Sequence, residues 1–362
     1  MFSGKKRMEE VRLRVVTPLF MGGARTEITE FRPPSLKGAL RFWFRAKNPD
    51  KLQEEARIFG STEAGQASFL IQLLDSPVAS EESINCGKGL SYLGYGLVKR
   101  GKIERSYIKP GEEIVLRIVF RPNVKQEVQQ DVMESMRCLC LLGGLGSRSR
   151  RGLGSVVLPS ELPVSSEELC DQIAATCQRN NLPEEVSHTA FSQRARIVIP
   201  FKERSWQGAL EKIGGELQAF RSFQTPPPNG PRFKRDHDLI YGAIKGNAPT
   251  TAPERVTFGL PQNYYFSSLK GARAGVTGAN RSRNRRASPL LIHTHLLADG
   301  QHAVVVSFLP APLLPSGDDL TISTGKGYAS KEFTVPVPEH WTAVESFMNH
   351  LAQLPGAVEV KF

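Results

Sequence analysis

Apolar and polar residues alternate with two different periods along the first 160 residues. In residues 10–16 the period is two, which predicts a strand with one buried face. In residues 35–47 the apolar positions follow helical spacing, and Ser35, after Pro33-Pro34, is expected to cap the helix. A second short helix is expected to end at Phe59-Gly60. The same criteria predict strands at 67–74 and 113–120, a long helix at 125–142 and a strand at 155–158.

This order of strand, helix, strand, strand, helix, strand is that of the ferredoxin-like fold. The polar stretch 159–193 is expected to connect two domains and to hold one helix at 166–177. The pattern then starts again with a strand at 195–200 and a helix at 206–223. Further elements are expected as a helix at 238–245, extended segments at 256–266 and 289–297, a strand at 303–308, a helix at 341–354 and a strand at 357–362.

The repeated order predicts a duplicated α+β protein with two tandem ferredoxin-like domains and antiparallel sheets, over residues 1–160 and 161–362. RNA-recognition domains use the same arrangement. Two similar short motifs support duplication, because each precedes an expected strand. They are Arg57-Ile58-Phe59-Gly60 and Arg255-Val256-Thr257-Phe258-Gly259. The proline-rich run TPPPNGP at 225–231 breaks any regular element, and its role stays open.

The charge balance favours a polyanionic partner. The 362 residues include 47 Lys and Arg against 36 Asp and Glu, which gives a net charge of +11 and a pI of about 9.5. A hydrophobic content of 40% is typical of globular rather than disordered chains. No apolar run approaches the roughly 20 residues that span a bilayer, and the N-terminal residues lack the apolar segment of a signal peptide. We therefore expect a cytoplasmic protein without membrane contact.

The segment with the clearest candidate chemistry is LLGGLGSRSRRGLGS at residues 141–155. Glycines such as Gly144 and Gly146 let the main chain approach a phosphate closely, while Arg148, Arg150 and Arg151 supply guanidinium forks that match phosphate oxygens. No Gly-Lys-Ser/Thr closes the segment, and it follows a helix instead of a strand, so a mononucleotide P-loop is disfavoured. The alternative is a surface hairpin whose arginines only aid solubility. We call residues 143–155 the Gly-Arg loop.

A basic stripe is expected on the helix at 35–47. Lys37, Arg41 and Arg45 are spaced four residues apart and therefore share one face, and no acidic residue lies between Ser35 and Pro49. This favours phosphate contact over the alternative of a solvated helix face. The adjacent aromatic residues of this helix, Phe42-Trp43, are expected in the core rather than as platforms for bases.

A second basic group lies within residues 273–286, where Gly, Ser and Asn surround four arginines. They are Arg281, Arg283, Arg285 and Arg286. This composition predicts a flexible loop that orders on RNA, since it cannot bury enough apolar surface to fold alone. The alternative is a disordered solubilising loop.

Several segments resemble a known family. Residues 17–46, TPLFMGGARTEITEFRPPSLKGALRFWFRA, are similar to the N-terminal signature of the RAMP superfamily of CRISPR systems, and more narrowly to the first subunit of the Cmr complexes of type III-B. The Gly-Arg loop resembles the glycine-rich loop of that superfamily, and RRASPL at 285–290 resembles a segment in the second half of the same subunit. The resemblance implies tandem ferredoxin-like domains in an RNA-guided antiviral complex, with guide RNA, target RNA and other RAMP subunits as partners. It further implies RNA binding near the guide 3′ end, while a different subunit cuts the target.

The sequence predicts neither a catalytic centre nor a cofactor or resident metal. RNA cleavage through the 2′-hydroxyl usually employs histidine, and none occurs before residue 188. His293 and His295 alternate in an expected strand and could share a face with His302, but without a carboxylate ligand they are weak evidence for a metal. Asp236-His237-Asp238 could pair a histidine with a carboxylate, yet no nucleophile lies beside it. The five cysteines include no Cys-x-x-Cys pair, so we expect reduced, buried thiols.

These observations favour a non-catalytic RNA-binding subunit of a type III-B Cmr complex. One alternative is a RAMP-type, metal-independent endoribonuclease that processes the guide precursor. A second alternative is a structural subunit that docks other proteins and touches RNA little. The residues expected to bind RNA are Lys37, Arg41, Arg45, Gly144, Gly146, Arg148, Arg150, Arg151, Arg281, Arg283, Arg285 and Arg286.

Overall fold

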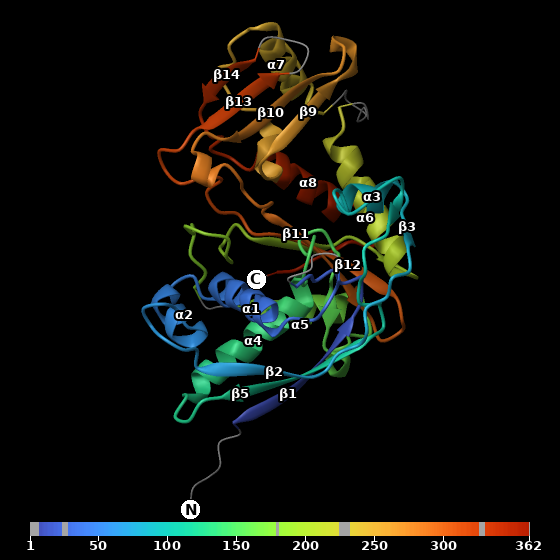
Figure 1. The fold of residues 1–362 in the computed structure, drawn as a ribbon, viewed down its shortest axis with the longest axis vertical. Helices are drawn as coiled ribbons and strands as arrows, with labels where there is room; N and C mark the ends of the chain where they lie inside the picture. The colour runs from blue at the N-terminus through green and yellow to red at the C-terminus, as the bar shows by residue number, and fades with distance from the viewer. Residues whose placement is uncertain (1–6, 24–27, 179–180, 224–231, 326–329, 362) are drawn as a thin grey trace, which may run out of the picture.

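A computed structural model describes residues 7–23, 28–178, 181–223, 232–325 and 330–361. The proline-rich run at 225–231 lies outside the described residues. Helices and strands stack along the long axis of the molecule, with the first sheet at one end and a small inserted sheet at the other (Figure 1). No helix among the described residues is long and apolar enough to cross a membrane.

The first unit is a ferredoxin-like sheet covered by helices on one face. Its antiparallel strands are ordered β2-β5-β1-β6, the order that the strand, helix, strand, strand, helix, strand connection produces in this fold. The main elements are β1 (Met8–Val15), α1 (Pro33–Lys47), α2 (Leu52–Phe59), β2 (Phe69–Asp75), β5 (Glu113–Phe120), α4 (Gln126–Leu142) and β6 (Val156–Val157). Alternate residues of β1 and β5 are buried, and α1 and α4 pack together over this face (Figure 1).

The second unit repeats the topology. Its strands are ordered β11-β12-β7-β15, and β8 (Lys202–Glu203) also pairs with β12. The elements are β7 (Arg196–Ile199), α6 (Trp206–Arg221), β11 (Leu290–Leu296), β12 (His302–Phe308), α8 (Thr342–Ala352) and β15 (Val358–Glu359). The prediction of tandem ferredoxin-like folds with antiparallel sheets is therefore confirmed.

The two units share apolar packing. Strands β11 and β12 are buried on both faces, because Val305 packs into the core of the first unit and Val304 into that of the second. Helix α5 (Ser166–Cys177) packs on α4. The connection also includes η1 (Pro159–Glu161). The boundary at residue 160 stays a prediction, and β11 and β12 contribute side chains to the cores of both units.

A third, inserted sheet extends the second unit. It is ordered β14-β13-β10-β9, and its strands come from two stretches of chain, one between α6 and β11 and one between β12 and α8. The elements are α7 (Lys234–Lys245), η2 (Glu254–Phe258), β9 (Gln262–Phe266), η3 (Ser267–Leu269), β10 (Ala272–Gly278), η4 (Arg281–Arg283), β13 (Leu320–Gly325) and β14 (Lys331–Val335). Helix α7 contacts β10 and β13.

Two sequence predictions about these elements were wrong. Helix α1 begins at Pro33 rather than after a Ser35 cap, because proline fits the first helical turn, where its missing N–H is not needed. The echoed motifs do not precede equivalent strands either. Residues 57–60 end α2 before β2, whereas residues 255–259 lead into β9 of the inserted sheet, and the true counterpart of β2 is β11.

A second insertion joins β2 to β5 in the first unit. It comprises β3 (Ile84–Asn85), α3 (Lys88–Leu93) and β4 (Lys102–Ile103). Helix α3 lies against α6 of the second unit (Figure 1), so this insertion bridges the two units.

Candidate nucleic-acid interface

The Gly-Arg loop is held by backbone hydrogen bonds to residues 17–20. Ser147 N donates to Phe20 O at 2.7 Å, and Gly154 N donates to Pro18 O at 3.0 Å. The Thr17 hydroxyl donates to Gly152 O at 2.7 Å. The TPLF motif and the Gly-Arg loop are therefore two parts of one folded structure.

The glycines of this loop serve its packing. Gly146 has a φ of +76°, and a Cβ added there would lie 2.3 Å from Phe20 O. A Cβ on Gly144 would meet Gly154 O at 3.1 Å. The side of each glycine that a side chain would occupy thus faces neighbouring backbone. The expectation that Gly144 and Gly146 admit a phosphate stays a prediction, and the structure gives a packing reason for both residues.

The loop also pairs with the second unit. Ile292 N in β11 donates to Arg150 O at 3.1 Å, and Arg151 forms a parallel bridge with Ile292. The ring of His293, also in β11, hydrogen-bonds to Gly143 O at 2.6 Å. Because a carbonyl can only accept, His293 Nδ1 carries the proton in this bond. These contacts fix the arginines of the loop at the junction between the two units.

Three predicted segments meet around Arg150. Its guanidinium lies 5.0 Å from the ring centroid of Phe42 in α1, and its Nη1 donates to Ser288 O at 2.7 Å. Ser288 closely follows Arg286. Burial, followed by repulsion from the charge of Arg286, lowers the pKa of Arg150 to about 10. The structure therefore brings α1, the Gly-Arg loop and the segment 281–288 together, although Phe42 is half-buried rather than a full member of the core.

Arg151 lies at the centre of a group of like charges. Burial, followed by repulsion from Arg221, Arg148 and Arg150, lowers the pKa of Arg151 to about 10, so the guanidinium is still charged at neutral pH. Arg221, at the end of α6, donates from Nη1 to the hydroxyl of Tyr92 at 2.6 Å and from Nη2 to Gln262 Oε1 at 2.8 Å. We call Arg148, Arg150, Arg151, Arg221 and Arg286 the arginine cluster.

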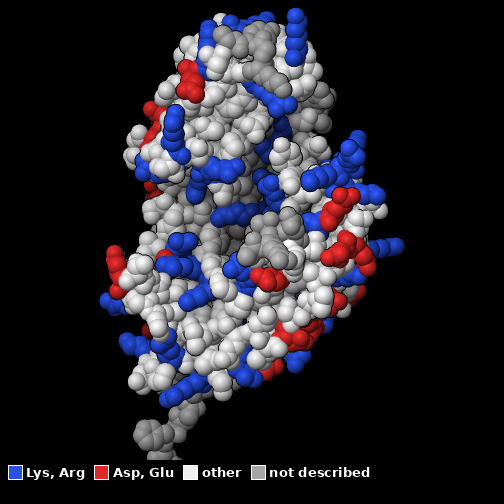
Figure 2. Space-filling model, viewed as in Figure 1, with Lys and Arg blue, Asp and Glu red and all other residues white. Residues whose placement is uncertain are grey.

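The arginine cluster lacks acidic partners within the part of the chain that the structure describes. There, none of its five side chains forms an ion pair, whereas the neighbouring Arg255 and Arg283 are paired with Asp236 and Asp318. Cations that repel one another without a counter-ion favour an incoming anion. Figure 2 shows Lys and Arg side chains gathered around a hollow between the inserted sheet and the part carrying α1, with Asp and Glu mostly toward the right and left edges of this view.

The basic stripe on α1 is partly neutralised, contrary to the sequence prediction. Arg41 and Arg45 share the buried carboxylate of Glu55 in α2, Arg45 at 3.8 Å and Arg41 in closer contact. The sequence between Ser35 and Pro49 contains no acid, but the fold supplies one from the next helix. Lys37 Nζ lies 5.5 Å from the Phe69 ring centroid, and burial with the charges of Arg41 and Arg121 lowers its pKa. RNA contact by these three residues stays a prediction.

The segment 273–286 is more regular than its composition predicts. Residues 272–278 form β10, paired on both sides by β9 and β13, and Arg281–Arg283 form η4. Arg283 pairs with Asp318 at 2.9 Å, while Arg281 and Arg285 are exposed. The prediction of a flexible loop over the whole segment was wrong, because neighbouring strands satisfy the backbone of β10.

The histidines raised as metal or acid-base candidates have structural contacts. His293 and His295 are buried with Nε2 and Nδ1 3.2 Å apart, and burial lowers the pKa of His293 to about 4. His302 pairs with Leu296 in the sheet and so lies on the opposite face from His295, contrary to the prediction. Over the described residues no group of three or more His, Cys, Asp or Glu side chains could hold a metal ion. Asp236 is buried and accepts from Glu254 N and Arg255 N at 2.8 and 2.9 Å.

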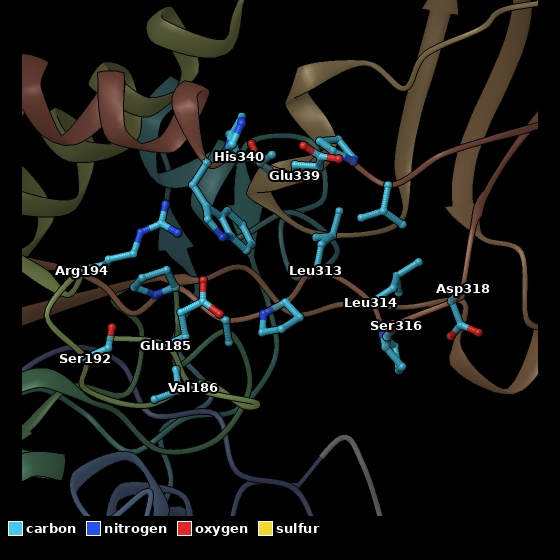
Figure 3. Close-up of a pocket in the computed structure, with 18 of the residues that line it drawn as sticks. Glu185, Val186, Ser192, Arg194, Leu313, Leu314, Ser316, Asp318, Glu339 and His340 are labelled. Carbon is cyan, nitrogen blue, oxygen red and sulfur yellow. The ribbon is translucent and has the colours of Figure 1, made fainter. Parts of the chain in front are cut away.

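A separate cavity of about 490 Å³ lies between residues 184–194, 310–318 and 337–341 (Figure 3). Leu313 and Trp341 contribute apolar surface to it, and Glu185 and Glu339 are among the residues that line it. Because several carboxylates line this cavity, it differs in chemistry from the arginine cluster.

Comparison with known proteins agrees with this architecture. The RAMP superfamily model matches residues 12–157. The CRISPR system Cmr subunit Cmr1-1 of Pyrococcus furiosus is 30% identical over 322 residues, covering 80% of this chain and 83% of that protein. The chain is a RAMP protein of the Cmr1 family. The Cmr subunit Cmr1-2 of the same organism is 27% identical over 173 residues, covering 40% of this RAMP protein and 91% of the relative.

A solved structure of this family has the same fold. The crystal structure of Cmr1 from Pyrococcus furiosus in its apo form aligns with a TM-score of 0.55 at 18% identity and covers 98% of each chain. The resemblance seen in residues 17–46 is therefore confirmed, and the fold similarity extends over the insertions as well as the two ferredoxin-like units.

Arg221 is the functional candidate that the sequence did not indicate. It occupies the last turn of an amphipathic helix, where a cation is common because it complements the helix dipole. Tertiary contacts with Tyr92 and Gln262 hold its side chain, and its charge acts on Arg151 of the Gly-Arg loop.

Proposed function

We propose that this protein is a non-catalytic, RNA-binding subunit of a Cmr-type CRISPR complex of type III-B. The similarity to a curated Cmr subunit supports membership of the complex. Guide RNA, target RNA and other RAMP subunits are the proposed partners, with contact near the guide 3′ end and a role in antiviral defence. The arginine cluster is the observation that carries RNA binding, because it gathers cations from three separate segments without an acidic partner among the described residues.

Phosphate contacts explain why arginine predominates in this cluster. Each guanidinium presents planar N–H donors that match two phosphate oxygens, and it remains charged even when half-buried. A backbone track of this kind binds single strands with little dependence on base identity. The proposed ligand is therefore single-stranded RNA.

The affinity for a fluorescently labelled single-stranded RNA tests this proposal. Arg148 is exposed and Arg151 half-buried, so the double variant Arg148→Ala/Arg151→Ala removes two charges. If each contact contributes about 1.5 kcal/mol, affinity should fall on the order of a hundredfold. The matched control is Arg12→Ala/Arg137→Ala, which removes two exposed arginines paired with Glu10 and Glu161. Equal affinities of the two doubles would refute the assignment.

The two competing functions make different predictions. An endoribonuclease would cut a repeat-containing RNA specifically in EDTA, and that activity would depend on His237. The contacts of His237 include stacking on Phe223 at a centroid distance of 4.1 Å and a 3.1 Å hydrogen bond to Asp238, which do not require a catalytic role. A purely structural subunit would give no ultraviolet crosslink to RNA in the assembled complex. We expect a crosslink and no cleavage.

A further inference from the structure

The insertion between β2 and β5 is fixed against α6 by close backbone contact. A Cβ on Gly89 of α3 would lie 2.0 Å from Glu211 O, and a Cβ on Gly214 of α6 would lie 2.3 Å from Gly89 O. The Glu211 carboxylate also accepts a hydrogen bond from Gly89 N at 2.9 Å. Two helices in such close approach have little freedom to shift, so the end of α3 is held in a defined place.

The end of α3 lies at the arginine cluster. Tyr92, in its last turn, accepts the hydrogen bond from Arg221 described above. The chain then forms a turn closed by bonds from Leu97 N and Val98 N to Gly94 O, at 2.8 and 3.2 Å. Within this turn, Arg148 Nη2 lies 2.8 Å from the position that a Cβ on Gly96 would take.

Tyr95 precedes Gly96 and is 74% exposed, which packing of the chain does not explain. Successive Cα atoms are about 3.8 Å apart, so this exposed tyrosine is the chain neighbour of Gly96, the residue whose Cβ position lies 2.8 Å from the Arg148 guanidinium. Arg148 itself has a left-handed backbone with φ +63°, a conformation that non-glycine residues seldom adopt and that recurs at functional sites.

We propose that Tyr95 is a stacking platform for one base of a single-stranded RNA whose phosphates contact Arg148 and Arg151. The inference rests on the proposed function and adds an element that the cluster alone lacks. Cations bind the backbone of any strand, whereas an exposed aromatic ring on the neighbouring turn can stack only on an unstacked base. Tyr95 therefore makes the interface selective for single strands over duplex RNA.

The test uses the full chain with Tyr95 replaced in two ways. Tyr95→Phe keeps the ring and should bind single-stranded RNA within about twofold of the native protein. Tyr95→Leu keeps an apolar side chain without the ring and should bind about 5- to 150-fold more weakly, which corresponds to the usual range for base stacking on an aromatic side chain. Affinity for duplex RNA should be the same in all three proteins. Since the residue is exposed, the thermal midpoint should not change.

A second readout reports stacking directly. An RNA with 2-aminopurine placed along the strand should show fluorescence quenching at one position with native protein and Tyr95→Phe, and lose that quenching with Tyr95→Leu. Unchanged affinity and quenching in Tyr95→Leu, together with weaker binding by Arg148→Ala/Arg151→Ala, would refute the stacking role and leave the proposed function standing. Native affinity in the arginine variant would instead refute the proposed function.

Discussion

Replacement of Gly154 by alanine should disrupt the Gly-Arg loop, because two separate costs coincide at this buried position. Gly154 has a φ of +70°, where an L-residue pays roughly 1–2 kcal/mol. The added Cβ would also lie 1.9 Å from Leu145 O, which is a backbone atom. Relief of that overlap would break the 2.8 Å bond from Leu145 N to Gly154 O, and a buried group left unpaired costs roughly 1–3 kcal/mol. The sum is about 2–5 kcal/mol.

Urea denaturation of matched glycine variants measures this cost. Gly300 also has a positive φ, +82°, but a Cβ there would meet no atom within 4 Å. Gly300→Ala should therefore lose only the conformational part, roughly 1–2 kcal/mol. Gly154→Ala should lose at least about 1 kcal/mol more and, where still folded, should bind single-stranded RNA more weakly. Equal losses of stability in the two variants would show that the loop is not packed as described.

Two further predictions concern buried groups and helix contact. Burial lowers the pKa of His293 to about 4 in the folded protein, against about 6.5 in the unfolded chain. The unfolded chain therefore takes up a proton first as the pH falls from 6.5 toward 4. Over that range the free energy of unfolding should decrease by up to about 3 kcal/mol. Denaturation at pH 7 and pH 5 measures this decrease. Between these two pH values the free energy of unfolding should fall more in the native protein than in His293→Gln/His295→Gln, and equal decreases would contradict the prediction. Gly214→Ala should destabilise the protein by about 1–3 kcal/mol, because the added Cβ would overlap the backbone of α3. The Cβ of Gly215→Ala would meet no atom within 4 Å, so this variant should be neutral or more stable by up to about 1 kcal/mol. Calorimetry of both variants checks this, and the reverse order would show that α3 and α6 are not in backbone contact.

Elements with one buried face could be predicted from the sequence. The alternation in β5 and the helical spacing in α4 and α5 gave bounds within a residue of those observed. Each of these elements packs one side on a core, so its own sequence carries the pattern. The motifs in residues 17–46 and 143–155 could be recognised by their similarity to the family signature, and backbone hydrogen bonds join residues 17–20 to the Gly-Arg loop.

The inserted sheet could not be predicted in the same way. Strand β10 reads ARAGVTG and β13 reads LTISTG, where small and polar residues predominate. Such segments become strands because β9, β13 and β14 supply hydrogen bonds across the ladder. These hydrogen bonds come from strands distant in sequence, so the local residue pattern only weakly indicates a strand.

The candidate site was predicted in part for a similar reason. Three loop arginines and Arg286 were identified from composition, and the structure places them in one cluster. The neutralisation of Arg41 and Arg45 by Glu55, and the contribution of Arg221, depend on which helices lie side by side. Neighbours that are distant in sequence decide whether a basic residue is free to meet a phosphate.

The salt dependence of RNA affinity tests the central claim most directly, since it counts the phosphates that the arginine cluster is proposed to neutralise. For single strands, the logarithm of the affinity falls with the logarithm of salt concentration by about 0.7 per phosphate contact. Arg148→Ala/Arg151→Ala should therefore flatten the slope by about 1.4, while Arg12→Ala/Arg137→Ala leaves it unchanged. A native slope in the first variant, or the same flattening in both, would contradict a phosphate track at the arginine cluster.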